Sequence, residues 1–118
     1  MTERDGKRLR ELLWFCSGVG ETLDRFGNDR EAFLHDRDYF DSVCMKLMQI
    51  GECSRRLSDA FKEQAKRFTA WTEIRGLRNL VVHEYGELDG DLLWETVTED
   101  IPALRRFCEQ TLAEAKNI

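Results

Sequence analysis

The sequence predicts an all-α protein, an antiparallel up-and-down bundle of four to five helices. Apolar residues recur at spacings of three and four in successive segments, which is typical of helices with one buried face. No segment shows the strict alternation of apolar and polar residues that indicates a strand. The 118 residues contain no repeat, low-complexity segment or internal linker, so residues 1–118 are expected to form a single domain.

The first predicted helix begins at a capping-box signal over Thr2 to Asp5 and ends before Gly27. Gly18 and Gly20 lie inside it, although each glycine costs about 1 kcal/mol of helix stability relative to alanine. We interpret them as points where a neighbouring helix approaches closely, the alternative being access to a cavity or ligand. The apolar residues at helical spacing are Leu9, Leu12, Leu13, Cys16, Val19, Leu23 and Phe26.

A short turn of helix is predicted over residues 30–36, and the second long apolar pattern follows it. That pattern obeys a heptad rule with one polar interruption at Ser54, which predicts a bundle seam. A shorter piece comes next, with Ser58 and Thr69 as its candidate ends and caps. The apolar residues of the seam are Phe40, Val43, Leu47, Ile50, Leu57 and Phe61.

The stretch from Trp71 to Tyr85 combines apolar periodicity with reactive side chains, and the rest of the chain is predicted to support it. Arg78 lies within the apolar stripe of an ideal helix, two turns before Tyr85, so both side chains are expected to project toward an apolar surface. A buried arginine needs a partner or an anionic ligand to offset its desolvation. The core-facing side carries Ile74, Leu77 and Val81, with Trp71 and Val82 at its edge.

His83 follows Arg78 by five residues, which places it about 140° away around an ideal helix, near Asn79 and Arg75 on the more polar side. Two arrangements could bring Arg78 and His83 together. Either the helix ends and turns near His83, as Gly86 would allow, or the two side chains approach most closely across two chains. The second arrangement implies a dimer.

The last helical segment follows a turn in which Asp89 or Gly90 is the cap. Pro102, the only proline, lies in its middle and either kinks one long helix or begins a second one. The apolar residues at helical spacing are Leu92, Leu93, Val97, Ile101, Leu104, Phe107, Cys108 and Leu112.

The net charge of −5 argues against binding of nucleic acid over the whole surface. The distribution is uneven, because the segment from Arg55 to Arg78 carries a local charge of +4 and leaves −9 for the rest. Two interpretations remain open for this segment, a solvated helical surface and a local phosphate-binding face.

The cysteines are expected to be reduced core thiols, because they lie in apolar periodic segments without any C-x-x-C spacing. His35 has no second histidine or carboxylate at ligand spacing and is interpreted as surface or structural, so no metal site is predicted. The first residues lack the features of a signal peptide and no apolar run reaches the length of a membrane span, so we expect a cytoplasmic protein. The four cysteines are Cys16, Cys44, Cys53 and Cys108.

Residues 78–85, RNLVVHEY, fit an Arg-x4-His-x-Tyr motif. With this motif the chain resembles the HepT-like proteins, minimal members of the HEPN superfamily, and Asn79 matches the usual Arg-Asn pair of that family. The resemblance covers about residues 38 to 112, and Cys53, where the family more often has alanine, departs from it outside the motif. The other matching runs are residues 48–52, residues 56–58, Trp71 with Ile74, and Trp94 with residues 101–104.

The resemblance implies a metal-independent ribonuclease toxin that needs no cofactor and acts as a homodimer, with two motifs facing one cleft. It implies catalytic roles for Arg78 and His83, and substrate-binding or orienting roles for Asn79 and Tyr85. The implied partner is an MntA-type nucleotidyltransferase antitoxin that adenylylates Tyr85. The residue types suit this chemistry, since histidine transfers protons near neutral pH and a guanidinium stabilises charge on a phosphate in the transition state.

Other interpretations stay open at this point. The chain could be a non-catalytic subunit that binds substrate or nucleotide for a nucleotidyltransferase, or a helical interaction module that only forms a dimer. His83 could be a helix cap, Tyr85 a buried core phenol and Arg78 half of an interface ion pair. Glu52 could be a solvated carboxylate or could orient Arg78. An interaction module predicts that Arg78→Ala and His83→Ala alter stability rather than RNA cleavage.

Overall fold

The computed structural model of the chain describes residues 1–116, and this part contains helices and no strand. None of the helices described is both long and apolar enough to cross a membrane. The prediction of an all-α bundle is confirmed. The elements are α1 (Glu3–Arg25), α2 (Arg30–His35), α3 (Arg37–Arg55), α4 (Asp59–Ala65), α5 (Trp71–Glu84), the 3-10 turn η1 (Tyr85–Glu87), α6 (Gly90–Glu95), the π-helical turn η2 (Thr96–Asp100) and α7 (Ile101–Lys116).

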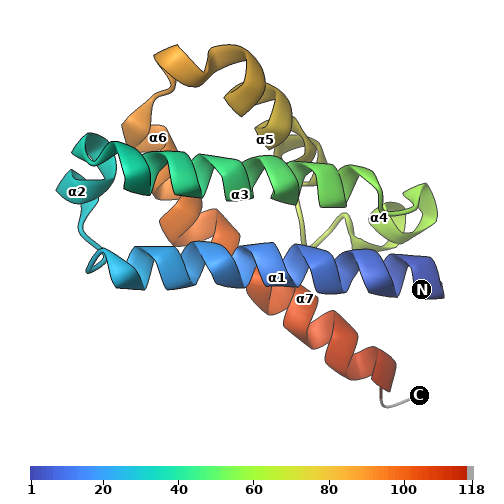
Figure 1. The fold of residues 1–118 in the computed structure, drawn as a ribbon. Helices are drawn as coiled ribbons and strands as arrows, with labels where there is room; N and C mark the ends of the chain where they lie inside the picture. The colour runs from blue at the N-terminus through green and yellow to red at the C-terminus, as the bar shows by residue number, and fades with distance from the viewer. Residues whose placement is uncertain (117–118) are drawn as a thin grey trace.

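Helices α1 and α3 lie side by side and antiparallel, and α5 packs along the other side of α3 (Figure 1). Helix α7 crosses α1 obliquely and closes one side of the bundle. The short helix α2 joins the ends of α1 and α3 and also contacts α6. As a result, α3 is the central helix, and α5 depends on α3 for most of its packing.

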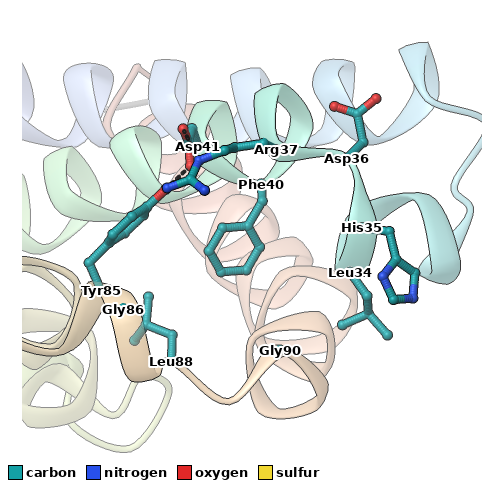
Figure 2. Close-up of a pocket in the computed structure, with 10 residues that line it drawn as sticks. All are labelled: Leu34, His35, Asp36, Arg37, Phe40, Asp41, Tyr85, Gly86, Leu88 and Gly90. Atoms are coloured by element: carbon teal, nitrogen blue, oxygen red, sulfur yellow. Dashed lines mark hydrogen bonds and ion pairs between the residues drawn. The ribbon is translucent and has the colours of Figure 1, made fainter.

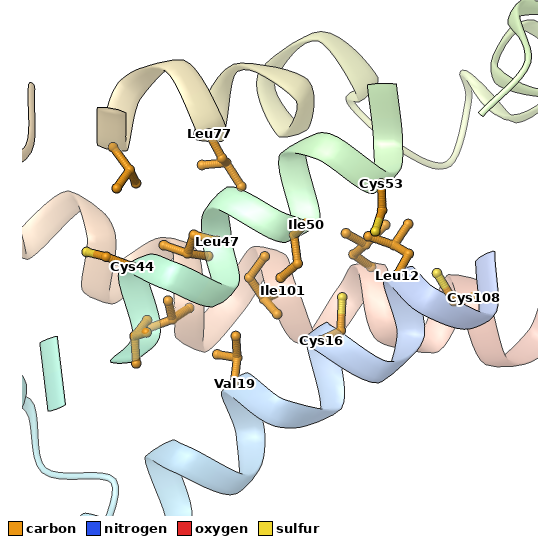
Figure 3. Close-up of a cluster of buried hydrophobic side chains, with 14 of the residues drawn as sticks. Leu12, Cys16, Val19, Cys44, Leu47, Ile50, Cys53, Leu77, Ile101 and Cys108 are labelled. Atoms are coloured by element: carbon orange, nitrogen blue, oxygen red, sulfur yellow. The ribbon is translucent and has the colours of Figure 1, made fainter. Parts of the chain in front are cut away.

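The core lies where the inner sides of α1, α3 and α5 meet the run from α6 to α7 (Figure 3). Leu12, Leu47 and Ile50 are completely buried there. All four cysteines are buried free thiols, as the sequence predicts. Burial raises the pKa of Cys44 and of Cys108 to about 12, because a thiolate is poorly solvated in an apolar surrounding.

Side-chain caps fix most of the helix starts at the predicted residues. The Thr2 hydroxyl accepts a hydrogen bond from the Asp5 backbone N–H at 3.0 Å, and the Ser58 hydroxyl accepts one from Phe61 at 3.1 Å. Asp89 caps α6 in the same way. The prediction for Thr69 is wrong, because α5 begins after Ala70, which offers no side-chain cap, and the Thr69 hydroxyl is buried without a partner among the described residues.

The close approach between helices occurs at Gly51 rather than at the two glycines of α1. Long side chains cover those two, since a Cβ on Gly18 would lie 3.2 Å from Lys46 and one on Gly20 would lie 3.4 Å from Arg105. At Gly51 a Cβ would lie 2.8 Å from the backbone nitrogen of Arg78. The absence of a side chain at this point of α3 therefore lets the α5 backbone pack directly against it.

Pro102 lies in the first turn of α7, directly after the π-helical turn η2. Proline cannot donate a hydrogen bond, and its ring collides with the carbonyl of the preceding turn in a regular α-helix. The wider π-helical turn accommodates this ring, and the backbone N–H of Ile101 bonds to the carbonyl of Thr96 across it. The helical run from Gly90 to Lys116 thus continues through the proline with one change of helix type.

Candidate functional site

Arg78 and Tyr85 of the motif lie beside residues of α3, which runs antiparallel to α5. We call this surface the open face, and its members are Asp41, Met45 and Glu52 on α3, Arg78 and Val82 on α5, and Tyr85 at the start of η1. Polar pairs between the helices mark its two ends, Tyr85 with Asp41 and Arg78 with Glu52. Between these pairs Met45 and Val82 are 56% and 44% exposed, respectively, so two apolar side chains lie uncovered in the middle.

Arg78 is exposed rather than directed toward an apolar surface, so that prediction is wrong. Because the α5 backbone packs directly on Gly51, the Arg78 side chain has no room between the two helices. It extends from the edge of the α3–α5 contact along the surface of α3. Its Nε lies 3.6 Å from Oε1 of Glu52, and its Nη1 donates to Oδ1 of Asn79 at 3.2 Å. The guanidinium is thereby oriented by a carboxylate and an amide while it stays accessible to solvent.

Glu52 is the centre of this end of the open face. Its two carboxylate oxygens accept hydrogen bonds from Arg55 at 3.2 Å each, and Arg56 lies 3.9 Å away. The hydrogen bond from Arg55 lowers the pKa of Glu52, and the charges of Arg78 and Arg56 act in the same direction. Of the two interpretations of Glu52, the structure agrees with the one in which it orients Arg78.

Tyr85 begins η1, directly after the last residue of α5. Its hydroxyl donates a hydrogen bond to Asp41, and Nε of Arg37 lies 3.9 Å from the same carboxylate. The hydrogen bond to Asp41 raises the pKa of Tyr85, since it stabilises the protonated phenol. Tyr85 is therefore a surface residue with an engaged hydroxyl, and the interpretation as a buried core phenol is wrong.

An open pocket of about 410 Å³ lies beside the Tyr85 ring (Figure 2). Sequence reasoning missed Asp41 and Arg37 as neighbours of the motif, because a contact across 44 positions leaves no local signal. His35 lines the pocket as well, and its Nε2 lies 3.5 Å from Glu31, which agrees with its interpretation as a surface residue. The lining residues are Leu34, His35, Asp36, Arg37, Phe40, Asp41, Tyr85, Gly86, Leu88 and Gly90.

His83 is exposed near the end of α5, on another side of the helix from Arg78. Helix α5 ends at Glu84, so the turn that Gly86 allows follows His83 and does not rotate it back toward Arg78. Five residues of α-helix separate the two side chains by about 140°. Within one chain, the motif histidine and arginine therefore face different directions.

Several cations of the basic segment between Arg55 and Arg78 pair with carboxylates, which is common on a solvated surface, although the segment keeps a net positive charge. Lys62 and Lys66 pair with Asp59 and Glu63, respectively, while Arg67 lies over the ring of Phe68.

Among residues 1–116 no group of three or more histidine, cysteine, aspartate or glutamate side chains could hold a metal ion.

Comparisons with known proteins agree on one family. The model of the family described as "Ribonuclease HepT-like" matches residues 15–111. A protein of Methanocaldococcus jannaschii, provisionally named as an RNase, is 34% identical over 110 residues, which cover 92% of this chain and 98% of that protein. One of Caldanaerobacter subterraneus subsp. tengcongensis, with the same kind of name, is 30% identical over 92% of this chain and 94% of its own length.

A protein of Thermococcus cleftensis, provisionally named as ribonuclease HepT, is 36% identical over 75 residues. The aligned part covers 64% of this chain and 67% of that protein. No solved structure matches the chain.

Proposed function

The chain belongs to the ribonuclease HepT-like family, and from this premise we propose that it is the toxin of a toxin–antitoxin pair, an endoribonuclease that cuts RNA without a metal ion. The observation that carries the proposal is the arrangement of the motif. Arg78 is exposed and oriented by Glu52, whereas His83 is exposed on a different side of α5. Both groups are accessible to a polymer that binds outside the core.

The chemistry requires two functions from the protein. The RNA 2′-oxygen attacks the adjacent phosphorus, its proton passes to a base, and the bond from phosphorus to the 5′-oxygen breaks as that oxygen gains a proton. His83 moves a proton in one of these steps, because imidazole exchanges protons near neutral pH. Arg78 stabilises the negative charge that grows on the phosphate oxygens, and Asn79 hydrogen bonds to Arg78 and orients it.

We further propose that a homodimer assembles the site. The exposed Met45 and Val82 form an apolar strip beside Arg78, and a second copy of the chain would cover it. Since Arg78 and His83 point in different directions within one chain, a second copy can supply the histidine that faces Arg78. Each of the two sites in the cleft would then combine Arg78 of one chain with His83 of its partner.

Tyr85 is the proposed point of control. Its hydroxyl lies at the open pocket beside Asp41, where a nucleotidyltransferase partner of the MntA type could reach it. The phenolic oxygen would bond to the α-phosphorus of ATP as pyrophosphate leaves, and its proton would pass to solvent or to Asp41. The attached AMP adds bulk and negative charge to the open face, which blocks RNA and competes for Arg78.

The first test is expression of the chain alone in cells, wild type against His83→Ala, with equal amounts of folded soluble protein. We expect growth arrest and RNA cleavage with the wild type only, unchanged by chelation of metals in the purified protein. If both forms behave alike and mass spectrometry shows that Tyr85 is unmodified, the ribonuclease proposal is wrong. The chain is then a non-catalytic subunit that binds substrate or nucleotide for a nucleotidyltransferase.

Mixing two inactive variants tests the shared site. An Arg78→Ala chain and a His83→Ala chain are each expected to be inactive, and their heterodimer regains one site with both groups intact. After exchange of subunits, about a quarter of the wild-type activity should return. No recovery, with heterodimers demonstrated by native mass spectrometry, would place both residues of a site in one chain.

Intact-mass measurement tests the control point. Coexpression with the partner should add AMP to the wild type, remove its RNA cleavage and leave Tyr85→Phe unmodified. AMP found on another residue would disprove the assignment of Tyr85.

A further inference from the structure

Trp14 is the most exposed of the large apolar side chains that the structure describes, at 72%. It lies in the middle of α1, where its ring packs edge-on against Phe15 at a centroid distance of 5.1 Å. Exposure of an indole is unfavourable, because its large apolar surface remains in water. A rigid aromatic ring held outward on a helix is, however, a suitable platform for stacking a planar ligand.

The ring borders a groove of about 750 Å³ between α1 and α3. Phe15 and Cys53 supply the apolar part of this groove, which we call the α1–α3 groove. Lys7, Arg10 and Trp14 follow each other at helical spacings of three and four, so they lie along one side of α1. The lining residues are Lys7, Arg10, Glu11, Trp14, Phe15, Gln49, Glu52, Cys53 and Arg56.

The α1–α3 groove is positively charged although the chain as a whole carries −5. Lys7, Arg10 and Arg56 contribute cations to its lining. Both of its carboxylates are already paired, Glu11 with Arg8 at 3.1 Å and Glu52 with arginines on α3 and α5. Arg56 also lies 3.9 Å from Glu52. Among the described residues no carboxylate pairs with Lys7 or Arg10, so these two cations are available to an anionic ligand.

The groove is continuous with the open face through Glu52, which lines the groove and also pairs with Arg78. We propose that the α1–α3 groove binds single-stranded RNA next to the cut site, with Trp14 stacked on one base and Lys7 and Arg10 at phosphates. The identity of the ligand as RNA rests on the proposed function. The combination of an outward aromatic ring with flanking cations favours a nucleic-acid strand over a protein partner, because such a strand presents a base face and phosphates in alternation.

Binding without cleavage tests this site. All variants carry His83→Ala, and the probe is a fluorescein-labelled single-stranded RNA of about 12 nucleotides, a length on the order of known single-strand sites. Trp14→Ala should weaken binding about tenfold, the factor that corresponds to one stacked base, and Trp14→Phe should recover most of it. The matched control is Phe68→Ala, because Phe68 is 67% exposed on a surface away from the groove and should leave binding unchanged.

Charge variants examine the cations at the phosphates. Lys7→Gln with Arg10→Gln should reduce the slope of log binding constant against log salt by about 0.7 for each phosphate that the protein no longer neutralises. Lys66→Gln with Arg106→Gln makes the same change of charge outside the groove and should change the slope less. Equal slopes for the two pairs would overturn the placement of Lys7 and Arg10 at phosphates.

Two results would overturn the Trp14 site. One is equal RNA binding by Trp14→Ala and the parent chain. The other is conversion of Trp14→Ala to a monomer by light scattering, which would assign Trp14 to the contact between copies. Binding that depends on Trp14, in a chain whose wild type cuts no RNA, would instead disprove the ribonuclease proposal and retain the groove as an RNA site.

Discussion

The two sides of α3 differ in what holds their residues in place. Leu47 is completely buried on the side that meets the core, whereas Met45, two residues earlier, is 56% exposed on the open face. On the buried side, apolar side chains and thiols fix positions by close packing. On the open face, Asp41 with Tyr85 and Glu52 with Arg78 connect α3 to α5. The packed core and the candidate functional site therefore lie on opposite sides of one helix.

Two alanine substitutions on α3 should give the largest difference in unfolding free energy between its two sides. Leu47→Ala should lower the free energy of unfolding by about 3 kcal/mol, because it removes buried methyl groups and leaves a cavity. Met45→Ala should change it by less than about 0.5 kcal/mol in the monomer. Urea unfolding measures both, and equal losses would show that Met45 is packed as tightly as Leu47.

Gly51→Ala tests the close packing that places the motif. Its Cβ would lie 2.8 Å from the backbone nitrogen of Arg78, so α5 must shift away from α3. We expect a loss of about 2 kcal/mol in unfolding free energy together with reduced RNA cleavage. Gly76→Ala is the matched control on α5, since its Cβ would meet no atom within 4 Å and the helix should tolerate or prefer alanine. A stable, fully active Gly51→Ala chain would contradict the close approach.

Glu52→Gln separates positioning from stability. The amide keeps the size of the carboxylate but loses the charge that attracts Arg78, so kcat for RNA cleavage should fall about tenfold, equivalent to about 1.4 kcal/mol. The urea midpoint should hardly change, because the side chain is partly exposed. Glu63→Gln, which breaks a similar pair with Lys66 at the end of α4, serves as the control and should leave cleavage unchanged.

The last substitution concerns Asp5, a buried carboxylate on α1, and its effect should be the smallest. Asp5 accepts hydrogen bonds from the Ser58 backbone N–H at 2.8 Å and from its hydroxyl at 2.7 Å, which ties α1 to the start of α4. Burial by itself would raise the pKa of Asp5, but the hydrogen bonds from Ser58 and Thr2 prevail and lower the pKa from its usual value. Asp5→Asn should cost about 1 kcal/mol at neutral pH.

The pH dependence of Asp5 has a definite sign. Because the folded pKa is lower than the unfolded value, the stabilisation is complete above that value and is lost as the pH falls through the folded pKa. The difference in urea midpoint between wild type and Asp5→Asn should therefore shrink from about pH 7 to about pH 3. A difference that is constant over this range would exclude ionisation of Asp5 as its cause.

Local signals predicted most of the helices correctly. Caps such as Thr2, Ser58 and Asp89 act through backbone groups within three residues, so their effect is written in the adjacent sequence. Thr69 failed as a cap because α5 starts after Ala70, where no side-chain bond forms. The heptad pattern identified buried residues correctly but could not show that α3 ends at Arg55, before Leu57 and Phe61.

The candidate site was predictable only in part. The motif named Arg78, Asn79, His83 and Tyr85, but periodicity directed Arg78 toward an apolar surface. Ideal helix geometry gives the direction of a side chain around its own helix but not the position of the neighbouring helix. The direction in which the Arg78 side chain extends depends on how closely α5 packs on Gly51. The α1–α3 groove was also missed, because the apolar spacing of α1 does not show that the Trp14 ring lies at the surface.

The sequence alone predicted the helices, the family and the candidate residues of one motif, because these depend on residue type and on spacing within a few turns. The contacts of Asp41 with Tyr85 and of Glu52 with Arg78, and the position of Glu52 in the lining of the α1–α3 groove, become visible only in the tertiary structure. Such pairs join residues that are far apart in the chain. They form because burial of the opposite sides of α1, α3 and α5 brings their outer sides together.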